Sequence, residues 1–560
     1  MSTVRSAKCE VRGLLRRGLA RATPHFAPRT SHCFRTGWFA LVLVITPHLA
    51  PRTSHAQSRW RPEDRTVIGE MLHIVAVASS FERLYVVSAE QVLIREPGRN
   101  EWQGPFTGPG LARAQDARGA LVDPLDLSLW IVSTAGWLHY DPTLELWEQG
   151  FTGETILGAG FDRTRPVDGL YLRLASGWVV ATRGGASASP AAEPPRPTDF
   201  VRVTTITDAA RANPQLAGAF SGTLMGPGLR PVRLTSAAPA GDRSGWWLGS
   251  DGAGLLWLPF GSLSPEPRPW GMPGEVVGAV FAVPGGAWAV TDRSLGSGAA
   301  LVQIPDDLAS TKWFFGDQVF GQPFRQVRAL HVVDSLLWIG TDQGALALSP
   351  KGERVRWLTE RDGLADRRVL SIAARRGRVV FGTAAGVVEL TDSGVVRIAH
   401  DYVGPAYSVA VNGDTTWVGT PRGLFAAVPG ERDVRQAPGW DALGVLRTPV
   451  TALLWRGDTL VALTEHSLLW RDPRNGSWTA GPDPSTQLGH GRALADGRDG
   501  VWIAGSLGLG FARLGGPVER QLKIGDALPA EPWDLSIEGA WLWVATSRGL
   551  VRFRREAVEP

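Results

Sequence analysis

This chain of 560 residues has little cysteine and no hydrophobic run long enough to cross a membrane near its start. Both cysteines, Cys9 and Cys33, lie in the first 56 residues, so the rest of the chain has no disulfide bond and no thiol chemistry. The apolar run Trp38–Ile45 has 8 residues, whereas a membrane-spanning helix needs about 20. These absences argue against a disulfide scaffold, a cysteine enzyme and a membrane anchor at this run.

Residues 1–56 have the pattern of a secretory signal peptide. They contain nine Arg or Lys and one acid, then the apolar run, then Ser54-His55-Ala56. We expect cleavage after Ala56 and a periplasmic or extracellular protein with no membrane span after cleavage. This leader contributes +8 to the formal net charge of +4, so residues 57–560 are at about −4. No basic face is therefore predicted, and nucleic acid is not an expected partner.

One short pattern recurs along the chain and is clearest in Leu336–Leu346. Counting from Trp338, a small residue follows at +2, Thr or Ser at +3, and Gly at +6. The anchors at position zero are Trp130, Tyr171, Trp247, Trp288, Trp338, Val380, Trp417, Leu460, Trp502 and Trp543, with a further weak copy at Tyr85. The glycines at +6 are Gly136, Gly177, Gly344, Gly386, Gly423, Gly508 and Gly549. A period near 42 residues over most of the chain indicates a repeat architecture.

Each period is predicted to contain four short strands. Val369–Ala374, Arg378–Thr383, Gly386–Thr391 and Gly394–His400 are β-rich runs separated by Gly, Asp or Ser. Asn412-Gly413 between two equivalent runs indicates a tight hairpin. Four antiparallel strands in about 40 residues are typical of a blade of a β-propeller. The sequence therefore predicts an all-β array of eleven or twelve four-stranded blades.

The repeated residues are interpreted as scaffold. The anchor is expected to pack between blades, the small residue at +2 to allow backbones to approach, and the Gly at +6 to open the next hairpin. Three copies also carry an acid-Pro turn ahead of a Trp on the outer strand: Glu96-Pro97 with Trp102, Asp141-Pro142 with Trp147, and Asp472-Pro473 with Trp478. The long step from Tyr171 to Trp247 is predicted to contain a worn copy at Leu216, with Gly218 and Gly222.

The two ends of the chain are predicted to share one blade. The last copy shows three strands between Trp533 and Arg555, and Ser58–Asp64 is expected to supply the missing outer strand. Because eleven or twelve blades are many for one ring, residues 57–560 are expected to form two propellers, one inserted in the other. Candidate junctions are Arg183–Pro197 and Pro259–Gly274, which are rich in Ala, Pro and Ser; both could instead be long loops.

The repeat resembles that of two-component regulator propellers. The resemblance is carried by Leu337–Leu346, Thr416–Phe425, Glu360–Ala374 and Ala495–Gly510, and it extends over nearly all of Ser58–Arg555. It implies the propeller fold of periplasmic sensor domains, or of stand-alone envelope and secretion-associated proteins. This chain shows no second apolar span and no kinase after its last repeat, so the resemblance implies a stand-alone protein.

No catalytic or metal-binding constellation is recognisable, and no cofactor is expected. The histidines after the leader are His73, His139, His331, His400, His466 and His490. They lack the paired spacing of metal ligands, and Asp496–Gly500 lacks the later ligands of an EF-hand. The function predicted is non-catalytic recognition of an envelope glycan or partner protein on a propeller face. The alternative is a metal-dependent lyase or other propeller enzyme acting on a small molecule or polysaccharide, with a His/Glu pair on one face.

Overall fold

The computed structural model describes residues 60–560 except 97–100, 108–115, 163–168, 195–199, 203–205, 215, 218–231, 293–298, 317–325, 376, 400–403, 428–433 and 445–446. In this part of the chain the strands form eleven antiparallel sheets, ten with four strands and one with five. Hydrophobic cores lie between consecutive sheets; one contains Trp338, Val369 and Phe381 from two neighbours. The predicted all-β propeller array is thus confirmed, with one blade larger than expected.

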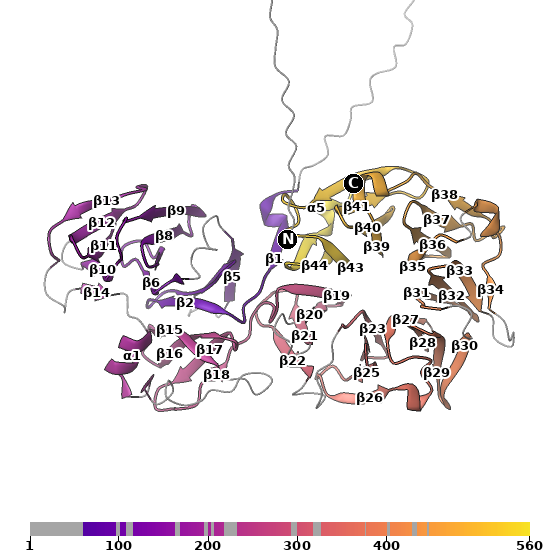
Figure 1. Ribbon diagram of the computed structural model, residues 1–560, viewed down its shortest axis with the longest axis horizontal. Coiled ribbons are helices and arrows are strands. Elements are labelled where there is room, and N and C mark those ends of the chain that lie inside the picture. The colour runs from indigo at the N-terminus through magenta and orange to yellow at the C-terminus, as the bar shows by residue number, and fades with distance from the viewer. Residues whose placement is uncertain are drawn as a thin grey trace, which may run out of the picture. The chain divides into compact units, whose positions relative to one another are not determined.

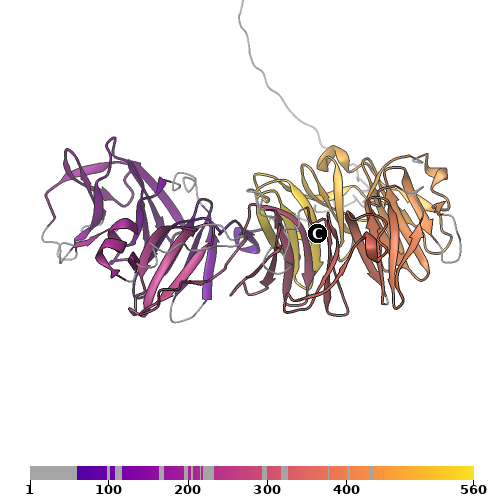
Figure 2. The same ribbon diagram turned by 60° about the horizontal axis from the view of Figure 1, so that its bottom comes forward.

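Seven sheets form a closed ring (Figure 1), and Figure 2 shows its strands running between the two faces. The first three sheets are β19 (Val276–Val283), β20 (Gly286–Asp292), β21 (Ala299–Pro305) and β22 (Lys312–Phe315); β23 (Ala329–Val333), β24 (Leu336–Thr341), β25 (Gly344–Leu348) and β26 (Arg354–Leu358); and β27 (Val369–Arg375), β28 (Arg378–Thr383), β29 (Gly386–Thr391) and β30 (Gly394–Ala399). A 3-10 helix, η4 (Glu360–Asp362), follows β26.

The next three sheets of the ring are β31 (Ser408–Asn412), β32 (Thr415–Thr420), β33 (Gly423–Ala427) and β34 (Arg435–Gln436); β35 (Val450–Arg456), β36 (Thr459–Thr464), β37 (Leu468–Arg471) and β38 (Trp478–Ala480); and β39 (Gly491–Asp496), β40 (Val501–Gly505), β41 (Gly508–Ala512) and β42 (Val518–Lys523). Short helices η5 (Asp441–Leu443) and α4 (Ser485–Leu488) lie in the connections. The first strand of each sheet lies beside the first strand of the next, around the axis.

The seventh sheet closes the ring with both ends of the described chain. It consists of β43 (Pro532–Glu538), β44 (Trp541–Thr546), β45 (Gly549–Arg554) and, as its outer strand, β1 (Arg65–Ile68). β43 lies beside β19, and a short helix, α5 (Arg555–Val558), follows β45. The predicted closure is confirmed. The strand is not Ser58–Asp64, however, because Pro62–Asp64 forms a 3-10 helix, η1, in which Asp64 accepts a hydrogen bond from the Arg61 amide.

The other four sheets lie between β1 and β19 in sequence and form the second propeller, here called the four-sheet propeller. Its sheets are β2 (Ile74–Ser79), β3 (Leu84–Ser88), β4 (Val92–Glu96) and β5 (Glu101–Phe106); β6 (Gly119–Val122), β7 (Leu129–Val132), β8 (Gly136–Asp141) and β9 (Leu146–Phe151); β10 (Gly158–Asp162), β11 (Gly169–Leu174), β12 (Gly177–Thr182), β13 (Ala188–Ala191) and β14 (Phe200–Arg202); and β15 (Arg233–Pro239), β16 (Gly245–Asp251), β17 (Leu255–Pro259) and β18 (Glu266–Pro267). The two connections to the ring pair with each other, since the Met71 amide donates to the Met272 carbonyl at 2.8 Å.

The long step of the repeat contains a helix where a worn blade was predicted. Helix α1 (Ile206–Ala212) packs against β15, and Leu216 lies in a further helical turn, buried with Leu234 and Leu248. Gly218 and Gly222 lie outside the described residues. The prediction of a worn copy at Leu216 is therefore wrong there, because its hydrophobic side chain is buried by a helix on the neighbouring sheet.

Two further local expectations differ from the structure. Arg183–Pro197 contains β13, which pairs with β12 of its own sheet, so this stretch runs within one blade. The other candidate junction, Pro259–Gly274, contains β18 and leads from the four-sheet propeller into the ring. The hairpin expected at Asn412-Gly413 has Gly413 and Asp414 as its loop, because Asn412 pairs with Thr415.

Among the described residues, no helix is both long and apolar enough to span a bilayer.

Candidate functional site

The ten repeat anchors lie on equivalent strands of ten sheets, each paired with the first and third strands of its blade; in the five-stranded sheet this strand, β11, is the central one. They lie in β7, β11, β16, β20, β24, β28, β32, β36, β40 and β44, in the order Trp130, Tyr171, Trp247, Trp288, Trp338, Val380, Trp417, Leu460, Trp502 and Trp543. All are buried except Trp247, which is half-buried. The glycines at +6 each begin the third strand: Gly136, Gly177, Gly344, Gly386, Gly423, Gly508 and Gly549. The anchors and these glycines therefore form part of the packing and the hairpins of the blades.

The hydroxyl at +3 has a role that the sequence analysis did not assign. The Thr420 side chain donates to the Gly423 carbonyl at 2.9 Å and accepts from the Arg422 amide at 3.0 Å. Thr341, Thr383 and Thr546 donate to the equivalent glycine carbonyls. The buried hydroxyl therefore satisfies backbone groups of the hairpin turn, which explains the Gly-Thr pair of the repeat.

The small residue at +2 is in close contact with neighbouring backbone or side chains. A Cβ added to Gly340 would lie 2.9 Å from Val369 Cγ1 in the first strand of the next blade, and one added to Gly505 would lie 2.2 Å from the carbonyl oxygen of Leu488, in the segment that leads into its own blade. The Gly344 backbone has φ +133°, a conformation that glycine adopts readily. Both glycine positions thus follow from backbone geometry.

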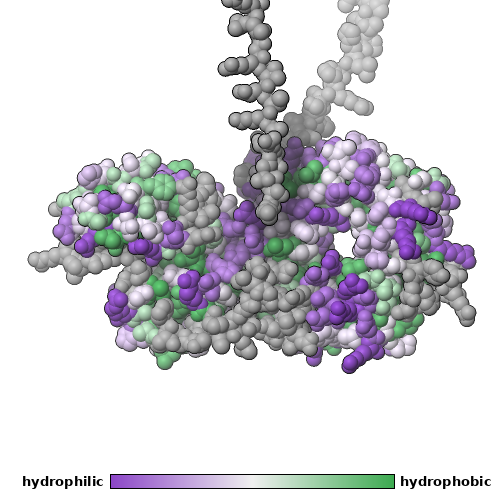
Figure 3. Space-filling model, viewed as in Figure 1, coloured by the Kyte–Doolittle hydropathy of each residue, from purple (hydrophilic) through white to green (hydrophobic). Residues whose placement is uncertain are grey.

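A cavity of about 800 Å³ lies on the axis of the ring and is walled by its inner strands. Figure 3, which looks along this axis, shows the hollow at the centre of the ring. The lining comes from the second half of each inner strand: Val280–Pro284, Leu330–Val332, Ile372–Arg375, Val409–Val411, Leu453–Trp455 with Gly457, Leu494–Asp496 and Asp534–Glu538. Seven separate chain segments therefore meet at one concave surface, as binding sites on propellers require.

The side chains of Arg375 and Trp455 meet in the wall of this cavity. The guanidinium carbon of Arg375 lies 5.6 Å from the centre of the Trp455 ring, a cation–π distance. Arg375 Nη1 is buried and makes no hydrogen bond with the described residues. A guanidinium beside an indole can still donate hydrogen bonds to a carboxylate, phosphate or carbonyl oxygen.

Asp534 and Ser536 join the last blade of the ring to the first. The Val280 amide donates to Asp534 Oδ2 and the Ala282 amide donates to Ser536 Oγ, both at 3.0 Å. Burial in the cavity wall raises the pKa of Asp534 to about 6, although the backbone hydrogen bonds from Val280 and Leu535 oppose this. The carboxyl therefore changes charge near the lower end of the physiological pH range.

Two other ionisable groups of the cavity, His331 and Asp496, are held neutral or paired. Desolvation lowers the pKa of His331 to about 4, and its ring lies 5.0 Å from that of Phe281. Asp496 Oδ1 lies 3.2 Å from Arg456 Nε, and burial raises the pKa of Asp496. Arg375 is thus the positive group of this lining that has no carboxylate partner among the described residues.

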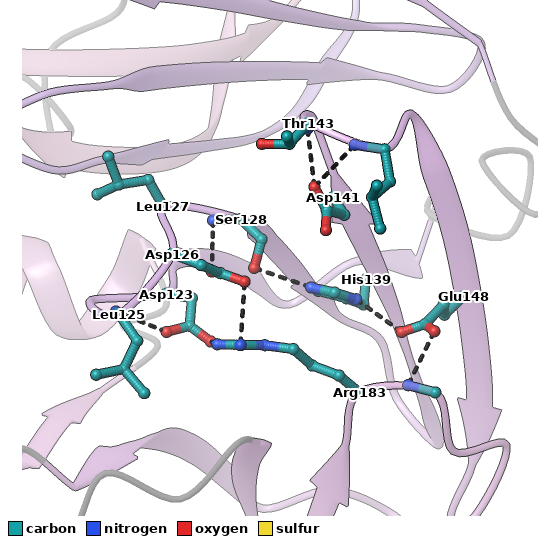
Figure 4. Close-up of polar contacts among 12 residues, drawn as sticks. Asp123, Leu125, Asp126, Leu127, Ser128, His139, Asp141, Thr143, Glu148 and Arg183 are labelled. Carbon is teal, nitrogen blue, oxygen red and sulfur yellow. Dashed lines mark hydrogen bonds and ion pairs between the residues drawn. The ribbon is translucent and has the colours of Figure 1, made fainter.

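A Ser-His-Glu chain lies in the sheet β6–β9 (Figure 4). His139 Nδ1 is 2.8 Å from Glu148 Oε2, and His139 Nε2 is 2.8 Å from Ser128 Oγ. The order matches that of a hydrolytic triad, but Ser128 is 0% and His139 is 2% exposed. A substrate cannot reach this serine. The cluster instead connects β8 and β9 to the turn that precedes β7, and the Gly184 amide donates to Glu148 from the next sheet.

The other described histidines, His73, His466 and His490, are half-buried or exposed and lie beside one or two acids. His490 Nδ1 is 2.9 Å from Glu465 Oε1, and His73 Nδ1 is 2.9 Å from Glu70 Oε1. Within the residues that the structure describes, no group of three His, Cys, Asp or Glu is arranged to hold a metal ion. His400 lies outside the described residues.

No family model matches this sequence, and no curated protein matches it. Among solved structures, it is similar to PorZ, a surface component of the type-IX secretion system of Porphyromonas gingivalis, at 9% identity and a TM-score of 0.51, over 88% of this chain and 87% of PorZ. The extracellular domain of a hybrid two-component system of B. thetaiotaomicron matches at 11% identity and a TM-score of 0.41, over 86% of this chain and 70% of its own.

Virginiamycin B lyase from Staphylococcus aureus matches half of this chain, 50%, and 94% of its own, at 13% identity and a TM-score of 0.40. At such low identity, the likeness to PorZ shows a shared fold and does not extend to partners. The extracellular domains of two-component systems are thus among the structures that are similar to this chain.

Proposed function

We propose that this chain is a secreted or periplasmic recognition protein that binds an envelope protein or glycan in the axial cavity of the ring and does not convert it chemically. The observation that carries the proposal is the Arg375 guanidinium, which lies against Trp455 with Nη1 unbonded in the cavity wall. Such a group is costly to keep in a scaffold without a partner, and it provides directional hydrogen bonds to an anionic or carbonyl oxygen.

Two further parts of the proposal concern the export of the protein and its relationship to a protein family. We propose that residues 1–56 are removed as a signal peptide and that the protein is a relative of two-component regulator propellers. The fold that it shares with PorZ supports an envelope partner, since PorZ is a surface component of a secretion system.

The test is retention of envelope material by the purified chain and by two variants, Arg375→Gln and Arg354→Gln. Arg354 is an exposed residue of the outer strand β26 and serves as the matched control. Glycan arrays and pull-downs from envelope extract should show a ligand that the intact chain and Arg354→Gln retain and that Arg375→Gln binds at least tenfold more weakly.

Equal retention by all three proteins would mean that the ligand does not bind to Arg375 in the axial cavity. Turnover of the retained molecule that stops on chelation would instead establish the alternative, a metal-dependent lyase.

A further inference from the structure

Trp247 departs from the burial of the other tryptophan anchors. Trp130, Trp288, Trp338, Trp417, Trp502 and Trp543 are between 0% and 6% exposed, whereas Trp247 in β16 is half-buried. A repeat residue that is less buried than its equivalents in the other blades points to a function other than stabilising the fold.

The exposed part of Trp247 lines a cavity of about 460 Å³ between the sheets β2–β5 and β15–β18. Trp257 in β17 pairs directly with Trp247, and the two ring centres are 4.6 Å apart. The outer strand β18 has only two residues, both exposed, so the sheet is truncated beside this pair. The result is an open pocket with a double-indole wall.

Two guanidinium groups lie at the same pocket. Arg95 Cζ is 5.5 Å from the Trp247 ring centre and 5.8 Å from that of Trp102, and Arg268 also lines the cavity. Desolvation and the positive charge of Arg268 together lower the pKa of Arg95. The described lining holds one carboxylate, Asp242, which accepts hydrogen bonds from the Ser244 amide and hydroxyl. Arg268 also pairs with Glu266, with Nη2 at 2.7 Å from Oε2. A carboxylate brought by a ligand would be a second partner and would further offset the repulsion between the arginines.

The pocket is preformed by contacts between its hairpins. The Ser79 hydroxyl donates to the Pro239 carbonyl, and the Phe260 amide donates to the Ser244 carbonyl at 2.9 Å. A Cβ on Gly241 would lie 2.4 Å from Phe81 Cα, so these two turns are in close contact. The side chains of Phe81 and Phe260 nevertheless remain 75% and 76% exposed. Ordered turns thus present two phenyl rings to solvent around an aromatic pocket.

We propose that this pocket, formed by Trp247, Trp257, Arg95, Arg268 and Phe81, docks a partner protein that inserts an aromatic side chain lying next to an Asp or Glu. The volume and the indole wall suit one aromatic ring, and the arginines suit the neighbouring carboxylate. Protruding phenylalanines beside Trp and Arg have the composition of energetic centres in protein interfaces. A sugar would stack on the indoles and leave the phenylalanines exposed, and a membrane would not fill a concave pocket.

The test is selection of random peptides on phage with the intact chain as bait. Enriched peptides should share an aromatic residue adjacent to Asp or Glu. Synthetic copies should bind at least tenfold more weakly to Trp257→Ala and to Phe81→Ser, a change at an exposed side chain with little effect on folding. They should bind with unchanged affinity to the control variant Trp533→Ala, which removes an exposed Trp that lies beneath Arg492 in the seven-sheet ring.

The proposal fails if no peptide depends on Trp257 or Phe81, or if dependent peptides lack the acid. It also fails if acidic oligosaccharides or anionic lipid vesicles, tested in parallel, are bound through these residues while peptides are not. Arg375→Gln should leave peptide binding unchanged, so this result separates the pocket from the axial cavity proposed above.

Discussion

The ring and the four-sheet propeller are built from the same repeat, yet they differ in regularity. Every sheet of the ring has four strands, and its anchors are buried. The four-sheet propeller contains the five-stranded sheet, the truncated strand β18, helix α1 and the half-buried Trp247. In the ring each sheet lies between two neighbours, and β1 closes the circle. Closure therefore favours a uniform repeat, and departures from it collect in the inserted propeller.

Replacing an anchor should give the largest difference between the two propellers in the free energy of unfolding. Trp502 is fully buried and packs edge-on against Phe511 at 5.4 Å, whereas Trp247 is half-buried. Trp502→Ala should lower the free energy of unfolding by about 3–5 kcal/mol, and Trp247→Ala by about 1 kcal/mol. Chemical denaturation measures both. Equal losses would mean that Trp247 is an ordinary anchor and that its exposure has no functional meaning.

The small residue at +2 should give the next largest contrast. A Cβ on Gly505 would meet the Leu488 backbone at 2.2 Å, whereas one on Gly249 would first meet the Ser236 side chain. Because a backbone cannot rotate away, Gly505→Ala should cost about 3 kcal/mol and Gly249→Ala clearly less. Gly278→Ala, with its nearest neighbour at 3.6 Å, is the neutral control. A reversed order would contradict the close contact between Gly505 and the segment that leads into its sheet.

The Asp534 carboxyl should make the ring respond to pH. Its pKa is raised to about 6 by burial, against about 3.9 for an exposed Asp. The folded state therefore binds this proton more tightly, and the resulting stability is fully present below pH ~4 and lost as the pH rises to ~6. Asp534→Asn should gain about 3 kcal/mol relative to the wild type between these limits. Asp242→Asn, at an exposed acid of the four-sheet propeller with a lowered pKa, should show no such gain.

Removing the turn hydroxyl at +3 should lower the free energy of unfolding by the same amount in both propellers. Thr420 of the ring and Ser250 of the four-sheet propeller are both fully buried and donate to a carbonyl of the following turn at 2.9 and 2.7 Å. Thr420→Val and Ser250→Ala should each lower the free energy of unfolding by about 1 kcal/mol. Thr415→Val, at a half-buried residue that starts β32, is the control. Unequal losses would mean that the turns of the two propellers are not equivalent.

The fold was predictable because the repeat states it many times. One Trp338 or Gly344 proves little, but the same spacing from anchor to glycine in seven copies indicates one supersecondary unit. The missing outer strand indicated closure by the N-terminal segment. Local errors arose where a single copy had to be judged alone. Leu216 has the apolar character of a strand residue, and only its contact with the neighbouring sheet makes it helical.

The candidate sites were not predictable in the same way. Arg375 and Trp455 are 80 residues apart and meet because two inner strands face one axis. Trp247 reads in sequence as an ordinary anchor, and its exposure depends on how short β18 is. The residues of a binding site assembled across blades have no fixed spacing in the sequence, so no motif reveals them. The hydroxyl at +3 was visible in the sequence, but its hydrogen bonds became visible only in the structure.

The measurement that bears most directly on the account is a disulfide cross-link between the two ends of the described chain. Val67 in β1 pairs directly with Val551 in β45, and residues 57–560 contain no cysteine. With Cys9 and Cys33 replaced by Ser, Val67→Cys together with Val551→Cys should oxidise to one intramolecular disulfide. Val67→Cys with Arg552→Cys should not, because adjacent residues of a strand point to opposite faces. Free thiols in the first pair, or equal oxidation of both pairs, would contradict a ring closed by its N-terminal strand.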